Sequence, residues 1–136
     1  MEVNNTLGPI DIAISGLQAQ GKNLEIISSN IANLRTTDAG NGQPYRRLEA
    51  ILKTKGDEDD IMGVTVDEII PDMSDFNRIL DPGNPNADKN GYVTMPNVNL
   101  PTEMINLNIA TKVYQANAAM LRRYQQMVEV SLELLR

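Results

Sequence analysis

The sequence predicts a mainly α fold, in which long N- and C-terminal helices pair as a coiled-coil layer with a short β-hairpin and extended-arm insert between them. Large aliphatic residues recur at seven-residue intervals near both ends of the chain, which is the spacing of a helical seam. Prolines and glycines crowd the middle and divide it into turns. With four Tyr, one Phe and no Trp among 136 residues, the core must consist of aliphatic and Met side chains, which suits packed helices.

The N-terminal segment, residues 1–34, is expected to be helical over about residues 9–34. Pro9 suits the first helical turn because its fixed φ fits there and its missing N–H is not needed. Gly16 and Gly21 each cost about 1 kcal/mol relative to Ala inside a helix, so we expect the close approach of another helix to compensate. The expected seam consists of Ile10, Ile14, Leu17, Leu24, Ile27, Ile31 and Leu34.

The C-terminal segment, residues 101–136, is expected to be one helix about 50 Å long that packs with the N-terminal helix. After Pro101 it contains neither Gly nor Pro, Thr102 is a candidate N-cap, and Glu103 suits the first turn. Two adjacent rows of residues repeat at seven: Val113, Met120, Met127 and Leu134 form one, and Leu107, Tyr114, Leu121, Val128 and Leu135 form the other, with Ala110, Asn117 and Tyr124 between them.

The apolar stripe on the C-terminal helix is two rows wide, which is more than one facing helix covers. Each large apolar side chain contributes roughly 1.5–3 kcal/mol when fully buried, and monomeric soluble proteins rarely leave a long apolar strip in water. We therefore interpret both terminal helices as polymerisation elements. The alternative is a soluble helical-hairpin adaptor, in which the two helices cover each other and the insert forms a small cap.

The insert, residues 35–100, is expected to contain a short β-hairpin followed by an extended arm. Residues 44–53 and 61–70 have partly alternating, β-branched patterns that predict strands, and the acidic run at 56–60 predicts an exposed hairpin loop. Residues 71–101 are rich in turns, with prolines at 71, 82, 85, 96 and 101. Disorder is one interpretation of this part, but its apolar residues favour an ordered arm that docks on a neighbour: Ile79, Leu80, Tyr92, Val93, Met95 and Val98.

Composition argues against several classes of function. Twelve basic and eighteen acidic residues give a net charge of -6, which opposes nucleic acid as a partner. The absence of His and Cys removes the usual catalytic triads, thiolate ligands and most zinc sites, so we expect no enzyme, cofactor or metal. The first twenty residues do not resemble a secretory signal, and no apolar run suggests direct membrane insertion.

One stretch, "NADKNG" at 86–91, looks like the start of a calcium loop, because Asn86, Asp88 and Asn90 alternate and Gly91 holds the sixth place. The twelfth position, where such loops need a bidentate Glu, is Asn97. We therefore predict an Asx-rich turn that caps its own backbone. A weak cation-binding loop at 86–97 is the alternative.

Three stretches carry a resemblance to a known family: "SSNIANLRTTDAGNGQPYRR" (28–47), "DPGNPNADKNGYVTMPNVNLPTEM" (81–104) and "TKVYQANAAM" (111–120). The chain resembles the flagellar basal-body rod proteins. The first stretch is shared by rod and hook proteins generally, so another axial protein is a second possibility. The second stretch is more specific and points to a component of the proximal rod.

The resemblance implies a structural subunit that polymerises with copies of itself and other rod proteins into the hollow drive shaft. It also implies export from the cytoplasm through the flagellar type III apparatus, a place in the basal body within the periplasm, and contact with the membrane ring and export apparatus. Torque would cross many aliphatic contacts in parallel, and the shaft would enclose the export channel. These are expectations for a bacterial motility protein that transmits force and catalyses nothing.

Specific residues are expected to make the assembly contacts. Asn30, Asn33 and Asn117 lie in or beside the apolar seams, where buried Asn fixes helix register; a solvent-facing or channel-facing role is the alternative. Arg46 and Arg47, and Arg122 and Arg123, are candidate contacts to a partner. The full set of expected contacts is Ile10, Ile14, Leu17, Leu24, Ile27, Asn30, Ile31, Asn33, Tyr45, Arg46, Asp81, Pro82, Gly83, Tyr92, Met95, Leu107, Val113, Tyr114, Asn117, Met120, Leu121, Tyr124, Met127, Val128 and Leu135.

Overall fold

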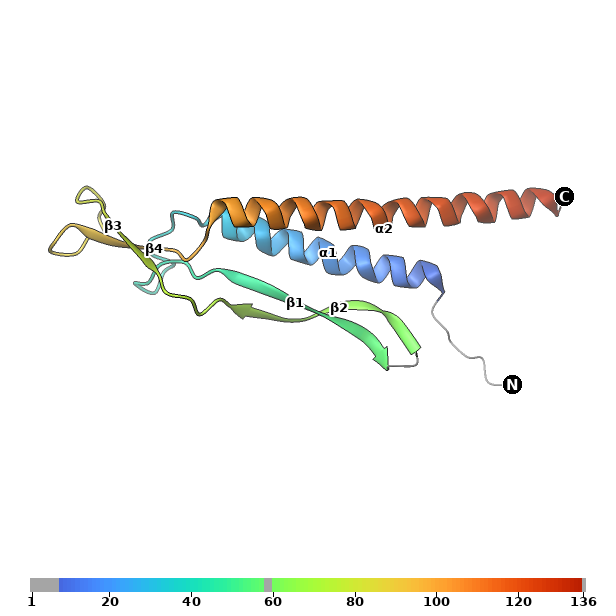
Figure 1. Cartoon of the computed structure of the whole chain (residues 1–136), viewed down its shortest axis with the longest axis horizontal. Coiled ribbons are helices and arrows are strands. Elements are labelled where there is room, and N and C mark those ends of the chain that lie inside the picture. The colour runs from blue at the N-terminus through green and yellow to red at the C-terminus, as the bar shows by residue number, and fades with distance from the viewer. Residues whose placement is uncertain (1–7, 58–59, 136) are drawn as a thin grey trace.

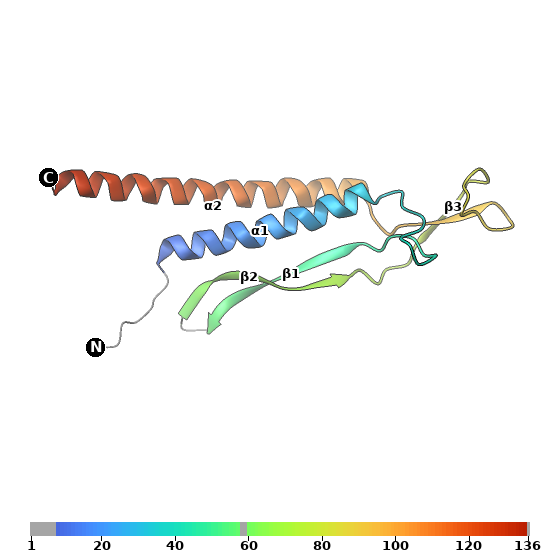
Figure 2. The same ribbon diagram turned by 180° about the vertical axis from the view of Figure 1, so that it is seen from behind.

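The computed structural model describes residues 8–57 and 60–135, which form an elongated molecule (Figure 1). In chain order its elements are α1 (Pro9–Ala32), β1 (Leu48–Asp57), β2 (Asp60–Pro71), β3 (Asn77–Leu80), β4 (Tyr92–Met95) and α2 (Leu100–Leu134). The two helices lie side by side, and α2 continues well beyond the start of α1 (Figures 1 and 2).

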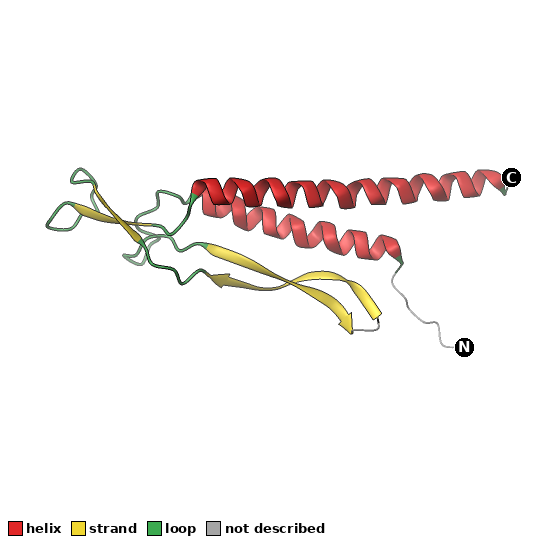
Figure 3. Ribbon diagram, in the orientation of Figure 1, coloured by secondary structure: helices red, strands yellow, loops and turns green. Residues whose placement is uncertain are grey.

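The expectation of a mainly α, coiled-coil fold is wrong. The insert contains two separate two-stranded antiparallel sheets, β1–β2 and β3–β4, and the first of them is a ribbon of 10- and 12-residue strands (Figure 3). This ribbon packs along α1 on the side away from α2, so α1 lies between a helix and a sheet. Of the two expected strands, the one at 61–70 lies close to the bounds of β2, whereas the one at 44–53 begins four residues before β1. A bulge between Ile51 and Leu52 interrupts the regular pairing of the ribbon.

The buried residues of α1 are Ala13, Ala19, Ile26, Ile27 and Asn30. The seven-residue row from Ile10 to Ile31 is only half-buried, because small residues rather than the largest ones face the neighbouring elements. At Gly16 a Cβ would lie 2.6 Å from Asn117 Nδ2, so this glycine does allow α2 to come close, as expected. Gly21 has no neighbour within 4 Å, and the same expectation is wrong for it.

The ribbon is fixed to α1 at a second point of close approach. The Val64 N–H donates to Ser15 Oγ at 3.0 Å, and Ser15 donates in turn to the carbonyl of Ile12. Gly63 has φ +123, and a Cβ there would lie 2.9 Å from Ser15 Cβ. The tip of the ribbon therefore needs glycine both for its backbone conformation and for its contact with the helix. Glu58 and Asp59, in the expected acidic loop, lie outside the described residues.

The helix α2 begins slightly earlier than expected, and its cap differs. Asn99 is the N-cap, and its Oδ1 accepts hydrogen bonds from both the N–H and the hydroxyl of Thr102. The assignment of Thr102 as the N-cap was wrong because Pro101 occupies the first turn, where a proline is well tolerated. Within the described part of the chain, neither helix has a stretch long and apolar enough to cross a membrane.

Candidate assembly surfaces and the polar junction

A buried polar junction joins the end of α1, the start of β1 and the first turn of α2. At its centre Asn30, 1% exposed, uses both ends of its amide. Its Nδ2 donates to the Leu48 carbonyl at 2.9 Å and to Glu103 Oε2 at 3.1 Å. Its Oδ1 accepts from the Leu48 N–H at 3.0 Å and from the Tyr45 hydroxyl at 2.9 Å. Asn30 is therefore fully satisfied within the chain.

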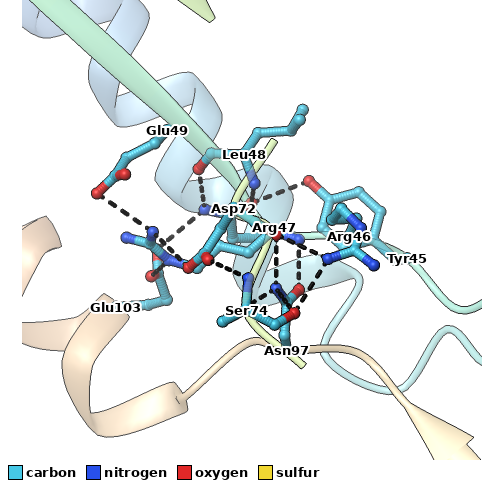
Figure 4. Close-up of polar contacts among 10 residues, drawn as sticks. Tyr45, Arg46, Arg47, Leu48, Glu49, Asp72, Ser74, Asn97 and Glu103 are labelled. Carbon is cyan, nitrogen blue, oxygen red and sulfur yellow. Dashed lines mark hydrogen bonds and ion pairs between the residues drawn. The ribbon is translucent and has the colours of Figure 1, made fainter. Parts of the chain in front are cut away.

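Glu103 is the only charged side chain that is fully buried in the described residues. It pairs with Arg47 in the same junction (Figure 4). Arg47 Nε donates to Glu103 Oε1 at 2.6 Å, and Arg47 Nη1 lies 3.3 Å from Glu49 and 3.4 Å from Asp72. Burial acts to lower the pKa of Arg47, but the hydrogen bond and charge of Glu103, assisted by Glu49, raise it overall. The guanidinium therefore stays charged and compensates the buried carboxylate.

Asn97 and Arg46 extend the junction to the segment that leads into the arm (Figure 4). Asn97 Oδ1 accepts from the Arg47 N–H at 2.8 Å, while its Nδ2 donates to the Asp72 carbonyl and to Ser74. Arg46 donates to the Asp72 and Ser74 carbonyls, and its guanidinium stacks 4.1 Å from the Phe76 ring centre. The junction thus fixes the direction of the arm relative to the helices.

Four members of this cluster were not predicted from the sequence to lie together: Arg47, Asp72, Asn97 and Glu103. No local pattern could have found them, since Arg47 and Glu103 are 56 positions apart in the chain. The one available signal is that two of the stretches that carry the family resemblance, 28–47 and 81–104, contain polar residues next to apolar ones. The structure brings these two stretches together at the junction.

The calcium-like stretch forms a turn stabilised by its own side chains. Asp88 Oδ1 accepts from the N–H groups of Asn90 and Tyr92, and its Oδ2 pairs with Arg78. The pKa of Asp88 is lowered, first by the hydrogen bond from Tyr92. Asn86 donates to Thr37. Because the one carboxylate is already engaged, the prediction of an Asx turn fits the observed geometry better than a cation loop does.

In the second half of α2 only the start of α1 gives cover, and Leu121 and Tyr124 there are half-buried. One side of α2 is exposed along its whole length: Ile105, Ile109, Met120 and Met127 are 57–61% exposed, and Leu134 is 83% exposed. An apolar cup of about 280 Å³, formed where α1 begins, is lined by Pro9, Ile10, Ala13, Met120, Leu121, Arg123, Tyr124 and Met127. Beyond this cup α2 continues alone.

The structure places the expected contact residues at three levels of exposure. Ile27 and Asn30 are buried within the chain. Half-buried are Ile10, Leu17, Leu24, Ile31, Asn33, Tyr45, Arg46, Met95, Leu107, Asn117, Leu121 and Tyr124. Exposed are Ile14, Asp81, Pro82, Gly83, Tyr92, Val113, Tyr114, Met120, Met127, Val128 and Leu135. Their contacts with neighbouring molecules stay predictions, and to the exposed set the structure adds Met104, Ile105, Ile109, Val130, Leu132 and Leu134.

In the described ranges 8–57 and 60–135, no three His, Cys, Asp or Glu residues group closely enough to hold a metal ion. The features that remain are an elongated subunit, a rigid junction and an exposed apolar helix face. Of these, the exposed apolar helix face is the feature most suited to contact with another molecule.

Family models identify the class. Residues 10–39 match the model described as flagella basal body rod protein, and residues 89–134 match the model described as flagellar basal body rod FlgEFG protein C-terminal. The first match covers nearly all of α1, and the second covers β4 and α2, the helix that carries the exposed apolar face. The fold and the matches therefore define an axial protein of the flagellar basal body.

Individual relatives identify the particular family. The flagellar basal-body rod protein FlgC of Salmonella typhimurium is 38% identical over 94% of this chain and 96% of its own length. FlgC of Agrobacterium fabrum is 40% identical over 92% and 91%, and FlgC of Bacillus subtilis is 34% identical over 92% and 95%. The chain belongs to the FlgC family of flagellar basal-body rod proteins. It is a structural rod subunit, not an enzyme, and it assembles with other components of the basal body.

Proposed function

We propose that the chain polymerises, with copies of itself and other rod proteins, through the exposed apolar face of α2, and that it forms part of the hollow proximal rod. The observation that carries the proposal is the exposure of Met120, Met127 and Leu134, spaced seven apart along one side of the helix. Each contributes roughly 1.5–3 kcal/mol when a neighbour buries it fully. Many such contacts in parallel would transmit torque along the shaft.

The size and core of the subunit support passage through the flagellar type III apparatus into the periplasm. In the described residues the buried apolar side chains are few, and three of the six are alanines: Ala13, Ala19, Ile26, Ile27, Val93 and Ala110. Such a core is weak, so the chain can unfold for export at low cost in free energy. The chain contains no Cys, so no disulfide opposes unfolding. Contacts with the membrane ring and the export apparatus belong to the same proposal.

Replacing Met120 and Met127 with Glu tests the proposal. We expect the double variant to be exported but absent from purified basal bodies, with loss of motility, because two charges would face an apolar neighbour. A matched control places the same charges on the polar side of α2, as Gln115→Glu and Gln126→Glu. Normal motility of the Met120 and Met127 variant would contradict the proposal.

A further inference from the structure

Methionine is the only sulfur-containing residue of this chain, which has seven Met and no Cys. Met62 and Met95 are half-buried, and Met1 lies outside the described residues. The other four methionines are more than half exposed: Met73 75%, Met104 57%, Met120 60% and Met127 58%. Because oxidation to methionine sulfoxide needs access to the thioether, these four are the accessible targets in the described residues.

Two of the four lie together in the apolar cup at the start of α1. Met120 and Met127 both line this cup, whose one charged residue is Arg123. They belong to the seven-residue row of α2 that also contains Val113 and Leu134. Those two residues contain no sulfur, so the oxidisable positions of the row are the two in the cup.

Oxidation changes this part of α2 from an apolar to a polar surface. A sulfoxide oxygen is a hydrogen-bond acceptor, and its burial against an apolar neighbour without a donor costs free energy. Arg123 lies three residues after Met120 and four before Met127, on the same side of the helix. If its guanidinium donates to a sulfoxide, a charge is held over the cup, which also opposes an apolar neighbour. Neither methionine is buried within the chain, so oxidation changes the surface and leaves the fold intact.

We propose that Met120 and Met127 form a modification site for hydroperoxides, at which oxidation to the sulfoxide keeps the free subunit out of the rod. The inference rests on the proposed function, since it requires the exposed face of α2 to be the assembly surface. In the assembled rod a neighbour covers both side chains, so the site is open only before incorporation. Reduction by a methionine sulfoxide reductase restores the apolar cup, which makes the block reversible.

The modification is a two-electron oxidation at each sulfur. A lone pair of the thioether sulfur attacks one oxygen of hydrogen peroxide, and the S–O bond forms as the O–O bond breaks. The leaving hydroxide takes the proton of the transferred hydroxyl group and departs as water. The sulfur is thereby oxidised to the sulfoxide, and the peroxide is reduced.

The wild-type chain tests the inference with an internal control. Met73, between β2 and β3, is the most exposed methionine of the described residues and lies outside α2. In cells that lack methionine sulfoxide reductases, another rod protein is withheld while the free subunits are treated with hydrogen peroxide. That protein is induced only after the peroxide has been removed, so that every subunit is oxidised before it can assemble. Peptide mass spectrometry then measures the sulfoxide fraction at each methionine in basal bodies and in the remaining free subunits.

We expect the sulfoxide fraction at Met120 and Met127 to be about tenfold lower in basal bodies than in free subunits, with equal fractions at Met73. Trypsin cleaves between Met120 and Met127, so the two are measured separately. Equal fractions in the two samples at all three positions would overturn the inference. The proposed function would still stand if the Met120 and Met127 Glu variant fails to assemble, whereas normal assembly of that variant would count against the proposed function itself.

Leucine variants give a second measurement. Met120→Leu with Met127→Leu keeps the row apolar and removes both thioethers, and Met73→Leu is the matched control. For each variant, incorporation after peroxide treatment is divided by its own incorporation without peroxide. This ratio should fall about tenfold for wild type and for Met73→Leu, and be preserved for the double variant. An equal fall in all three would also overturn the inference.

Discussion

The rest of the chain buries residues in the first half of α2, residues 100–117, whereas in the second half, residues 118–134, it covers Ala118, Leu121 and Tyr124 only in part. In the first half, Glu103 and Ala110 are buried, and Asn117 lies against Gly16 of α1. In the second half, no described residue is buried, and Met120, Met127 and Leu132 are 58–62% exposed. One continuous helix thus serves the fold at its start and association at its end.

The largest loss of unfolding free energy in the free subunit is expected from Arg47→Ala, in the junction. The change leaves the Glu103 carboxylate buried without its cation, which costs about 3–5 kcal/mol. Urea unfolding of the purified chain measures the loss. The double variant Arg47→Met with Glu103→Met is the control, since it removes both charges and should regain most of the stability. A loss below 1 kcal/mol for Arg47→Ala would show that the junction does not hold the first half of α2.

Alanine substitutions in the apolar residues should separate the two regions. Ile27→Ala, on the buried side of α1, is expected to cost about 2–5 kcal/mol of unfolding free energy. Leu134→Ala, in the second half of α2, should change it by less than about 0.5 kcal/mol. In swimming assays we expect Leu134→Ala to reduce motility in spite of its normal stability. Equal destabilisation by the two changes would remove the distinction between the halves.

The two glycines inside α1, Gly16 and Gly21, form a matched pair that tests whether α2 packs against α1 as far along as Asn117. Gly21→Ala should stabilise the subunit by about 0.5–1 kcal/mol, because nothing lies near the new methyl group. Gly16→Ala should gain less or destabilise, since the methyl group meets the Asn117 amide at 2.6 Å and that side chain must move. Thermal unfolding of both variants measures the difference. An equal gain in stability for both variants would show that Asn117 does not pack closely against Gly16 of α1.

The smallest expected effect is a change of the unfolding free energy with pH, caused by Asp72 in the junction. The pKa of Asp72 is lowered, first by hydrogen bonds from Ser74 and further by Arg47. A carboxyl whose folded pKa is lowered contributes stability above its ordinary pKa of about 3.9, and loses it as pH falls through the folded value. Wild type should therefore lose its advantage over Asp72→Asn as pH falls below about 4. A constant difference between the two, measured by urea unfolding down to pH 2.5, would contradict this.

The helices could be predicted from sequence because their signals are local. Pro9, the seven-residue rows and the absence of Gly and Pro after Pro101 place both helices within a few residues. The ribbon was predicted as a hairpin of strands at 44–53 and 61–70, near its observed bounds, whereas the paired strands β3 and β4 were taken for an extended arm, because dense turns hide their pairing. Glu103 was interpreted as a first-turn carboxylate, and its pairing with Arg47 depends on tertiary structure alone.

The candidate surfaces, like the fold, could be predicted only in part from the sequence. Rows of exposed apolar residues on α2 follow from helical periodicity, so Met120, Met127 and Leu135 were expected as contacts. Periodicity alone could not show that Asn30 and Tyr45 are engaged inside the chain, because their partners come from other elements. The apolar cup requires α1 and α2 to meet and has no signature in either segment alone.

Amide hydrogen exchange along α2, compared between the free subunit and the assembled rod, tests the central claim most directly. We predict slow exchange over residues 103–117 in both states, and fast exchange over residues 121–134 in the free subunit that becomes slow in the rod. Equal protection of both halves in the free subunit would contradict the account, as would a second half that stays unprotected after assembly.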